Sequence, residues 1–200
     1  MTKLIPELFI IESLNLEDEE EQLFEGEIIK RMLRLSGKVN TKYYYIRTEQ
    51  ELEEILDIFD KSNYRYLHIT CHADKNSMAT TFDNILFKDL GDMLSPFIKK
   101  RRVFVSACEM ANKQLANCLI SGTGCYSVIG PKKRINFDDA AAFWVSFYHL
   151  MFKINEKGMG KKNLKWCVTE LAALYKTPIN YYTHSKTAKQ GYVKVRTRKI

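Results

Sequence analysis

Two segments of the chain decide its fold class: YRYLHITC at residues 64–71 and RVFVSA at residues 102–107. The first is rich in aromatic and β-branched residues, which is typical of a strand. The second is a compact apolar run bounded by charged residues, as expected of a strand buried in a parallel sheet. His72 follows the first segment and Cys108 follows the second, so both predicted strands end at a residue that can carry chemistry.

Predicted helices and strands alternate on both sides of these two segments. Further strands are expected at residues 8–11, 42–47, 85–87 and 125–129, with edge strands or an extended tail at 179–182 and 192–195. Apolar spacing and capping residues predict helices at residues 16–35, 49–59, 90–97, 111–120, 138–152 and 163–175. This alternation predicts an α/β fold, a three-layer α/β/α sandwich with a mainly parallel central sheet. The chain has no repeat, low-complexity tract or linker, so residues 1–200 are expected to form one domain.

The first predicted helix opens on an acidic stretch. Asn15 is a suitable N-cap, and the acidic residues 17–21 follow it where the helix dipole favours negative charge. Apolar residues at helical spacing continue to Leu35, and Gly37 supplies a stop. One continuous helix is therefore expected over residues 16–35.

The charge of the chain is unevenly distributed. Residues 1–60 carry 15 acidic and 7 basic side chains, whereas residues 61–200 carry 9 acidic and 24 basic ones, which gives the net charge of +7. The basic residues cluster at 99–102, 132–134 and 194–199. Such clusters can bind nucleic acid or an acidic partner, but no nucleic-acid motif with interleaved aromatic residues accompanies them. A solvated basic surface is the favoured interpretation, and a nucleic-acid-binding protein is the alternative, which a steep salt dependence of retention on DNA or RNA would reveal.

Composition disfavours several other classes of protein. Apolar residues make up 46% of the chain and aromatic residues 12%, which is ordinary for a globular protein and wrong for a disordered one. No apolar stretch approaches the ~20 residues of a membrane-spanning helix, and the N-terminus lacks the features of a signal peptide. We therefore expect a cytoplasmic protein without a membrane partner. The five cysteines include no CxxC pair, which disfavours a disulfide framework or a zinc site, and no cofactor is expected.

His68, Cys71 and His72 also allow a metal site to be considered. Histidines four residues apart converge on one ion in a helix, but in a strand they lie about 13 Å apart. Cys71 would moreover point to the opposite face of the sheet. No metal site is therefore predicted, and His68 is expected to pack on the face that it shares with Thr70 and His72.

Cys108 and His72 form a candidate catalytic pair. Sites in parallel sheets form at the carboxyl ends of the strands, and adjacent strands lie about 4.8 Å apart. A cysteine attacks a carbonyl group as the thiolate, so it needs a neighbouring base or a helix N-terminus to lower its pKa. His72 would then deprotonate Cys108 or protonate the departing amine. Taken singly, each residue also fits a structural role: Cys108 as a small buried hydrophobe, and His72 as a core or surface histidine.

Four sequence blocks resemble the CHAT branch of the caspase-like (clan CD) cysteine peptidases, relatives of separase and caspases. In chain order they are LHITCHA at 67–73, VFVSACE at 103–109, VIG at 128–130, and DAAAF at 139–143 continuing to Phe147-Tyr148. The match covers roughly residues 64–152. It implies the caspase-like α/β/α sandwich and a cysteine endopeptidase that cleaves a protein or peptide substrate. It also implies control by a regulatory partner, in bacterial (antiviral) defence or programmed death.

The resemblance also assigns roles to individual residues. Cys108 would be the nucleophile, and His72 the general base and acid. The backbone N–H groups of Ala73 and Cys108 would supply the oxyanion donors, each worth ~3–4 kcal/mol in comparable enzymes. Asp138 or Asp139 would bind a basic P1 side chain, although either could instead cap the helix that follows.

Two positions depart from the family pattern. Ala73 stands where the family has glycine, which keeps the N–H donor but excludes a backbone that needs a positive φ. Residues 131–134 (PKKR) replace the usual Leu-Trp, and a basic loop lining the pocket would repel a P1 Arg or Lys. An acidic or neutral P1 residue, or a partner that covers this loop, is the alternative. The same departures keep open a catalytically inactive docking or regulatory module.

Overall fold

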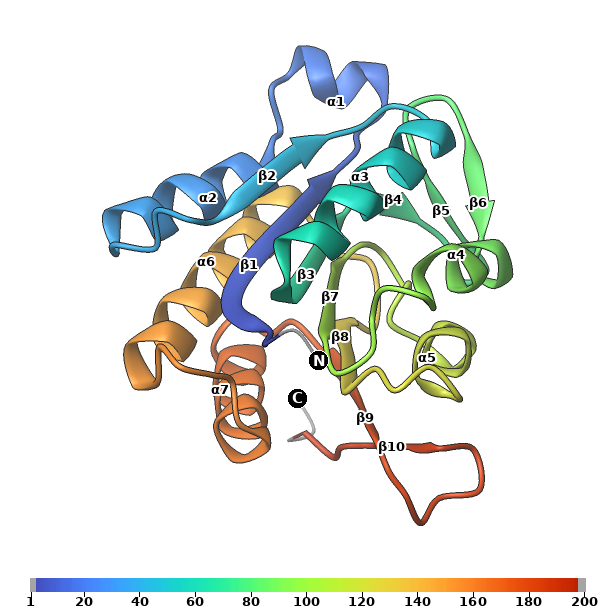
Figure 1. The fold of residues 1–200 in the computed structure, drawn as a ribbon. Coiled ribbons are helices and arrows are strands. Elements are labelled where there is room, and N and C mark those ends of the chain that lie inside the picture. The colour runs from blue at the N-terminus through green and yellow to red at the C-terminus, as the bar shows by residue number, and fades with distance from the viewer. Residues whose placement is uncertain (1–2, 198–200) are drawn as a thin grey trace.

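The computed structural model describes residues 3–197, and a seven-stranded sheet forms its centre (Figure 1). The strands are β1 (Ile5–Glu12), β2 (Lys42–Tyr45), β3 (Tyr64–Thr70), β7 (Arg102–Ser106), β8 (Ser127–Pro131), β9 (Ile179–His184) and β10 (Tyr192–Lys194). Their order across the sheet is β10-β9-β8-β7-β3-β1-β2. The five strands from β8 to β2 are parallel, and β9 and β10 add to one edge in antiparallel fashion. The prediction of a mainly parallel central sheet is confirmed.

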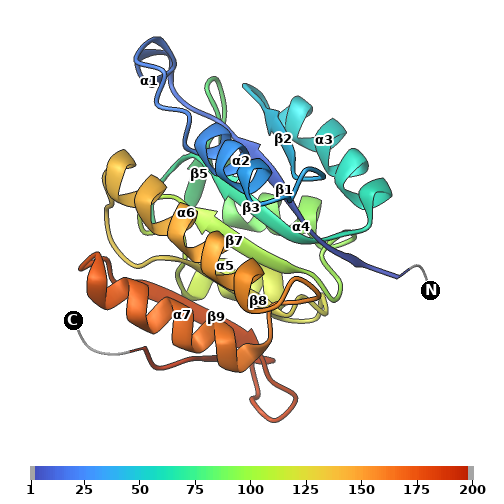
Figure 2. The same cartoon turned by 90° about the vertical axis from the view of Figure 1, so that its left-hand side faces the viewer.

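Helices cover both faces of this sheet (Figure 2). They are α1 (Leu16–Glu20), α2 (Glu25–Leu35), α3 (Glu49–Ser62), α4 (Phe87–Leu94), α5 (Lys113–Ile120), α6 (Phe137–Ile154) and α7 (Lys161–Leu174). One apolar core joins the sheet to α3, α4 and α5, and a second joins it to α2, α6 and α7. Alternate side chains of a strand point to opposite faces, so Leu67 of β3 enters the first core and Tyr66 enters the second. No helix within residues 3–197 is both long enough and apolar enough to cross a bilayer.

The packing of α6 on the sheet is mainly aromatic. Phe143, Trp144, Phe147 and Tyr148 are fully buried, and three of these rings contact the ring of Phe104 in β7. Each such side chain stabilises the fold by ~1.5–3 kcal/mol relative to an exposed position. This packing holds the first turn of α6 beside the carboxyl ends of β3 and β7.

A second, three-stranded sheet follows β3, and the sequence predicts only part of it. It contains β4 (His72–Ala73), β5 (Ser77–Ala79) and β6 (Asn84–Leu86), paired in antiparallel fashion. Strands of two or three residues are too short to show the alternation that identifies a strand, so β4 and β5 were not expected. His72 therefore does not end the central strand, which stops at Thr70, but opens a hairpin just beyond it.

The helix expected over residues 16–35 is broken in two, which corrects the sequence-based prediction. Between α1 and α2, Gln22 adopts a left-handed conformation with a φ of 59°. The break lets α2 pack closely on the sheet, because a Cβ atom on Gly26 would lie only 2.8 Å from Ile10 Cγ2. The Gly26 N–H also donates to the buried Glu12 Oε1 at 2.9 Å. These contacts join residues that are distant in the sequence, so the spacing of apolar residues within the helix could not predict them.

Gly130 allows β8 to approach the end of β7. A Cβ atom at this position would lie 2.4 Å from the Val105 carbonyl oxygen and 3.0 Å from the Ala111 Cβ. No side chain fits there without movement of the backbone. This close contact fixes the segment that carries Cys108, which lies between Val105 and Ala111 in the sequence.

Candidate active site

The pairing of β3 with β7 places the two predicted catalytic residues at one edge of the sheet. The register aligns Thr70 with Ser106, and the Cys71 N–H donates to the Ser106 carbonyl oxygen at 3.3 Å. His72 and Cys108 follow this aligned pair at the same spacing along their strands. Because neighbouring strands lie about 4.8 Å apart, the two residues emerge side by side at the carboxyl edge.

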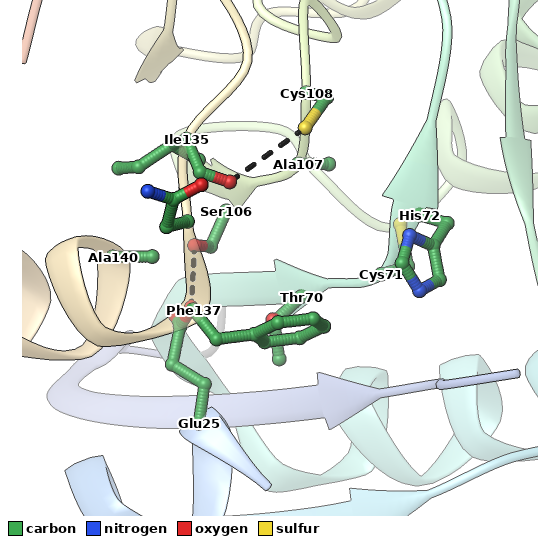
Figure 3. Close-up of a pocket in the computed structure, with 11 residues that line it drawn as sticks. Glu25, Thr70, Cys71, His72, Ser106, Ala107, Cys108, Ile135, Phe137 and Ala140 are labelled. Carbon is green, nitrogen blue, oxygen red and sulfur yellow. Dashed lines mark hydrogen bonds between the residues drawn. The ribbon is translucent and has the colours of Figure 1, made fainter. Parts of the chain in front are cut away.

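Both side chains line one pocket (Figure 3). Its walls come from the ends of β3 and β7, the start of α2, and the loop that leads into α6. The residues that line it are Glu25, Thr70, Cys71, His72, Ser106, Ala107, Cys108, Ile135, Asn136, Phe137 and Ala140. The structure thus places His72 and Cys108 on the wall of the same pocket.

Cys108 lies in a sharp turn after β7. The next residue, Glu109, has a φ of 56°, a left-handed conformation that is uncommon for a residue with a side chain. The Cys108 thiol is partly exposed, and its Sγ is turned toward the carbonyl oxygen of Ile135 at 3.9 Å (Figure 3). No backbone acceptor for the Cys108 N–H is found within residues 3–197. The turn therefore holds Cys108 at the pocket, and unusual backbone conformations of this kind cluster at functional sites.

Cys71, Cys125 and Cys167 are buried, whereas Cys118 is partly exposed, as Cys108 is. Burial has the same effect on all four of these other thiols. It raises the pKa of Cys71 and of Cys118, and it raises the pKa of Cys125 and of Cys167 to about 12. A thiol with a raised pKa stays protonated at neutral pH and is a poor nucleophile. Cys108 is the candidate nucleophile because it is partly exposed and lines the pocket.

His72 is held from the side by α1. Its Nε2–H donates to Asp18 Oδ2 at 2.5 Å, and the Asn15 amide nitrogen lies 3.4 Å from the same ring nitrogen. The ring also meets Phe137 edge-on, with 5.8 Å between the two centroids. The bond to Asp18 selects the tautomer with its proton on Nε2. Nδ1, which has no hydrogen-bond partner within the described residues, is then free to accept a proton.

Asp18 is a site residue that sequence reasoning missed. It belongs to the acidic stretch that was expected only as a favourable helix start. Asn15 Oδ1 accepts a hydrogen bond from the Asp18 N–H at 2.8 Å, which caps α1. The next residue, Glu19, forms an ion pair with Arg47 at 2.6 Å, and this pair ties α1 to the end of β2. The only signal in the sequence was the capped acidic cluster, because the contact with His72 is a tertiary one.

Glu25 brings a second acidic group to the buried side of the pocket (Figure 3). Ser106 Oγ donates to Glu25 Oε2 at 2.8 Å, and His68 Nε2 lies 3.4 Å from Oε1. Burial raises the pKa of Glu25 to about 8 and lowers the pKa of His68 to about 3, so both are mainly neutral near pH 7. Tyr148 continues the network into α6, since its hydroxyl lies 2.8 Å from His68 Nδ1. The pocket therefore ends at an uncharged, hydrogen-bonded acid.

The remaining predicted site residues do not line the pocket. Asp138 and Asp139 are exposed in the first turn of α6, where Asp138 Oδ1 accepts a hydrogen bond from the Asp139 N–H at 2.9 Å. The structure does not bring either carboxyl group to the pocket, and Glu25 is the acidic residue among those that line it. Ala73, the other expected oxyanion donor, lies in β4 opposite Met78 of β5.

The basic loop behaves differently from the expectation drawn from its sequence. Residues 132–134 are exposed, and none of them lines the pocket. The loop contributes Ile135, Asn136 and Phe137 instead. The basic side chains therefore do not form the wall that was expected to repel a cationic P1 residue.

No protein-family model matches the chain, and no curated protein matches it in sequence. Solved structures do match its fold. A secreted C11 cysteine protease from Bacteroides thetaiotaomicron, in complex with an irreversible peptide inhibitor, gives a TM-score of 0.54 at 9% identity, over 89% of this chain and 66% of its own. Caspase-1 from Spodoptera frugiperda gives 0.57 at 11% identity, over 87% and 79%. The Arg-specific cysteine proteinase gingipain R (RGPB) gives 0.52 at 11% identity, over 86% and 43%.

These likenesses establish the fold. The three neighbours are clan CD cysteine proteases, and the chain shares their mainly parallel sheet between two layers of helices. The predicted caspase-like three-layer sandwich is thus confirmed. The chain spans slightly less than two thirds of the C11 protease and less than half of the gingipain chain.

Proposed function

We propose that this chain is a cysteine endopeptidase in which Cys108 is the nucleophile, His72 transfers protons and Asp18 orients His72. The observation that carries the proposal is the shared pocket, which His72 and Cys108 line from the ends of two paired parallel strands. The neighbouring folds support it, since their names describe cysteine proteases and one of them holds a peptide inhibitor. The substrate is accordingly a protein or peptide.

The proposed reaction proceeds through a thioester. The Cys108 thiol passes its proton to His72 Nδ1, and Sγ forms a bond to the carbonyl carbon of the substrate. The C–N bond then breaks as His72 passes that proton to the departing amine. Water attacks the thioester in the second half of the reaction, which releases the carboxylic acid and restores the thiol. Because Sγ is turned toward Ile135 (Figure 3), a change of the Cys108 χ1 rotamer has to precede the attack.

Asp18 acts through His72 as a positioning residue. Its carboxyl group accepts the Nε2–H bond at 2.5 Å, which leaves Nδ1 as the basic nitrogen. Orientation of a catalytic imidazole by a carboxyl group is a general requirement when histidine acts as base and acid in turn. Nε2 of His72 therefore anchors the ring to Asp18, and Nδ1 transfers the proton.

Backbone N–H groups would stabilise the oxyanion. The Cys108 N–H lacks a backbone acceptor within residues 3–197, which supports its use as a donor, and we assign the second donor to Ala73. Each donor would lower the barrier by ~3–4 kcal/mol, as in comparable acyl-transfer enzymes.

The finer assignments also belong to this proposal. The order of the four sequence blocks supports the CHAT branch and its relation to separase. Control by a regulatory protein partner and a role in defence follow from that resemblance. The five free cysteines support a cytoplasmic location. Control by a partner would account for a free protein whose thiol is turned away from the imidazole.

Selective alkylation tests the nucleophile. Iodoacetamide should label Cys108 before the other four thiols, as read by peptide mass spectrometry, because Cys71, Cys125 and Cys167 are buried and Cys118 lies outside the pocket that His72 lines. On a peptide panel that varies at P1, Cys108→Ala and His72→Ala should each lower kcat/KM by at least ~10³-fold while the circular dichroism spectrum is kept. Cys118→Ala is the matched control and should cleave normally. First labelling at Cys118 or Cys167, or full cleavage by Cys108→Ala, would refute the proposal.

An inactive docking or regulatory module is the second candidate. The orientation of the thiol favours it, because within residues 3–197 no hydrogen bond joins Cys108 to His72. This candidate predicts that Cys108 resists alkylation and that no peptide is cleaved, with or without neighbouring gene products. Rapid labelling of Cys108 that is abolished in His72→Ala would exclude it.

A further inference from the structure

A second, more open groove lies beside the segment that carries Cys108. Its volume is about 360 Å³, and it is lined by Lys75, Asn76, Glu109, Asn112, Lys113, Gln114 and Lys132. Glu109 follows Cys108 directly in the chain, so one end of the groove lies at the candidate nucleophile. The groove is therefore close enough to Cys108 to receive residues on one side of a scissile bond.

Three lysines from three separate segments line the groove, and a fourth, Lys194, interacts electrostatically with two of them; we call the four the lysine cluster. Lys75 lies in the turn between β4 and β5, Lys113 begins α5, Lys132 follows β8, and Lys194 ends β10. Burial and the charges of Lys132 and Lys113 lower the pKa of Lys194, which places these three ammonium groups within each other's field. The fold has thus brought together basic residues that are far apart in sequence, which a simple run of surface charge does not do.

The lysine cluster is poorly neutralised within the chain. Lys75 forms a loose, exposed ion pair with Glu109 at 3.8 Å, and Lys194 lies over the Tyr182 ring at 5.6 Å from its centroid. The ammonium groups of Lys113 and Lys132 have no acidic partner within residues 3–197. Like charges in proximity cost free energy, which an anionic ligand would offset.

We infer that the lysine cluster binds an acidic segment of the peptide substrate, beside the scissile bond. The identification of that segment as substrate rests on the proposed peptidase function. An extended peptide advances about 3.3 Å per residue, so Asp or Glu residues within a few positions of the cleaved bond can reach the cluster. Complementary charge of this kind speeds association and selects among substrates.

The lining of the groove favours a peptide over a nucleic acid. Its seven residues include no aromatic side chain, whereas proteins that hold single strands stack the bases on aromatic rings. The groove also contains amide side chains, Asn76, Asn112 and Gln114, which can bond to a peptide backbone. A nucleic-acid ligand is therefore the alternative outcome that the test must separate.

The first arm of the test measures binding without catalysis. Fluorescein-labelled octa-glutamate is titrated onto the Cys108→Ala protein in low salt, with fluorescence anisotropy as the readout. The double variant Lys113→Glu/Lys132→Glu should weaken binding by about 10-fold or more, as expected for the loss of several exposed charge pairs. The control Lys162→Glu/Lys165→Glu changes the net charge equally, but on exposed positions of α7, and should change binding by less than about 2-fold.

Three results of this arm would overturn the inference. They are no measurable binding of octa-glutamate, an equal loss in the α7 control, and tighter binding of an octa-thymidylate that depends on the same two lysines. The last result would assign the groove to nucleic acid.

The second arm measures turnover. Peptides that differ only in Glu or Gln at positions flanking the scissile bond should show a Glu preference in kcat/KM, and Lys113→Glu/Lys132→Glu should abolish it. Cleavage without any Glu preference overturns the inference and leaves the peptidase function intact. No cleavage and no labelling of Cys108 refute the peptidase function, whereas lysine-dependent binding of octa-glutamate would still support an acidic-peptide groove.

Discussion

Asp18 and Glu25 approach the pocket from the two sides of the break between α1 and α2, and their surroundings give them different properties. The Asp18 side chain is 17% exposed and hydrogen-bonds to His72, whose side chain is 42% exposed. The Glu25 side chain is 3% exposed and hydrogen-bonds to Ser106 and His68. One acidic segment thus supplies an anchor for the imidazole at the solvent rim and an uncharged polar group in the interior.

The difference arises from desolvation. An ionised carboxyl group in the interior costs free energy unless a cation pairs with it. His68 cannot serve as that cation, because burial lowers its own pKa to about 3. Glu12 on β1 follows the same rule as Glu25, since burial, with a smaller contribution from the neighbouring Glu25, raises its pKa to about 7. Glu25 is also surrounded by Cys71 and Tyr148, whose pKa values rise mainly through burial and partly through Glu25.

The largest effect is expected from Glu25→Gln, on stability. The pKa of Glu25 in the folded protein is about 8, above its ordinary value of 4.5, so the folded state holds a proton that the unfolded chain releases between these values. Stability should therefore fall as the pH rises from about 4.5 to about 8, by an amount on the order of 5 kcal/mol for this group. Glu25→Gln cannot ionise, so it should be more stable than the wild type at pH 8.5 and close to it at pH 4.5.

Urea unfolding at a series of pH values measures this effect. A smaller slope against pH should remain in Glu25→Gln, because Glu12 titrates in the same direction. Glu12→Gln supplies the matched comparison. Identical pH profiles for the wild type and Glu25→Gln would show that Glu25 is ionised in the folded protein, and the contrast with Asp18 would then disappear.

Asp18→Asn should affect activity and leave stability nearly unchanged. The amide can no longer enforce the Nε2–H tautomer of His72, so kcat should fall about 100-fold, equivalent to ~2.7 kcal/mol. As a partly exposed residue, it should change the free energy of unfolding by less than ~1 kcal/mol. The pH profile of kcat/KM should also change, which a purely structural role would not cause.

The conservative variant sharpens this prediction. Asp18→Glu keeps the acid and should restore more activity than Asp18→Asn, with KM close to the wild-type value. Equal loss in both variants, or an unaltered pH profile in Asp18→Asn, would show that Asp18 only holds α1 in place.

The contrast also shows where sequence reasoning succeeds. The segments around His72 and Cys108 were predictable because a buried parallel strand leaves a local signature, and paired strands must end at the same edge. The positions of Asp18 and Glu25 were not predictable. They depend on the left-handed conformation of Gln22 and on the close packing of Gly26 against the sheet. The resemblance assigns Asp138 and Asp139 to substrate binding, and both lie exposed in the first turn of α6, outside the residues that line the pocket.

The hairpin after β3 teaches the same lesson. His72 was expected to end a strand, and instead it starts β4, whose partner β5 has only three residues. His72 still lies at the carboxyl edge of the central sheet, because the pairing of β3 with β7 sets the direction of the chain through Thr70. The local sequence pattern therefore predicts which edge of the sheet carries the site, whereas tertiary contacts determine which further residues complete it.

Tyr148→Phe should have a smaller effect on stability, and it probes the buried network around Glu25 without affecting Asp18. It removes the hydroxyl that bonds to His68 Nδ1 at 2.8 Å and leaves a buried nitrogen without a partner. The expected loss of stability is ~1–2 kcal/mol. Urea unfolding should show the same decline with pH as in the wild type, because Glu25 keeps Ser106 as its donor. A flattened pH profile in Tyr148→Phe would mean that Glu25 and Tyr148 titrate as one unit.

The smallest effect is expected at the break itself. Gln22 has a φ of 59°, which glycine adopts without the ~1 kcal/mol strain of a residue with a Cβ atom, so Gln22→Gly should stabilise the protein by at most ~1 kcal/mol and keep its activity. Gln22→Val places a β-branched side chain in the same conformation and should cost ~1–2 kcal/mol. Because the break directs α1 toward His72, the valine variant should also lower kcat/KM through a weakened Asp18–His72 bond. If both variants retain full activity and stability, the left-handed conformation of Gln22 is not what places Asp18 at the surface and Glu25 in the interior. The packing of α2 alone must then do so.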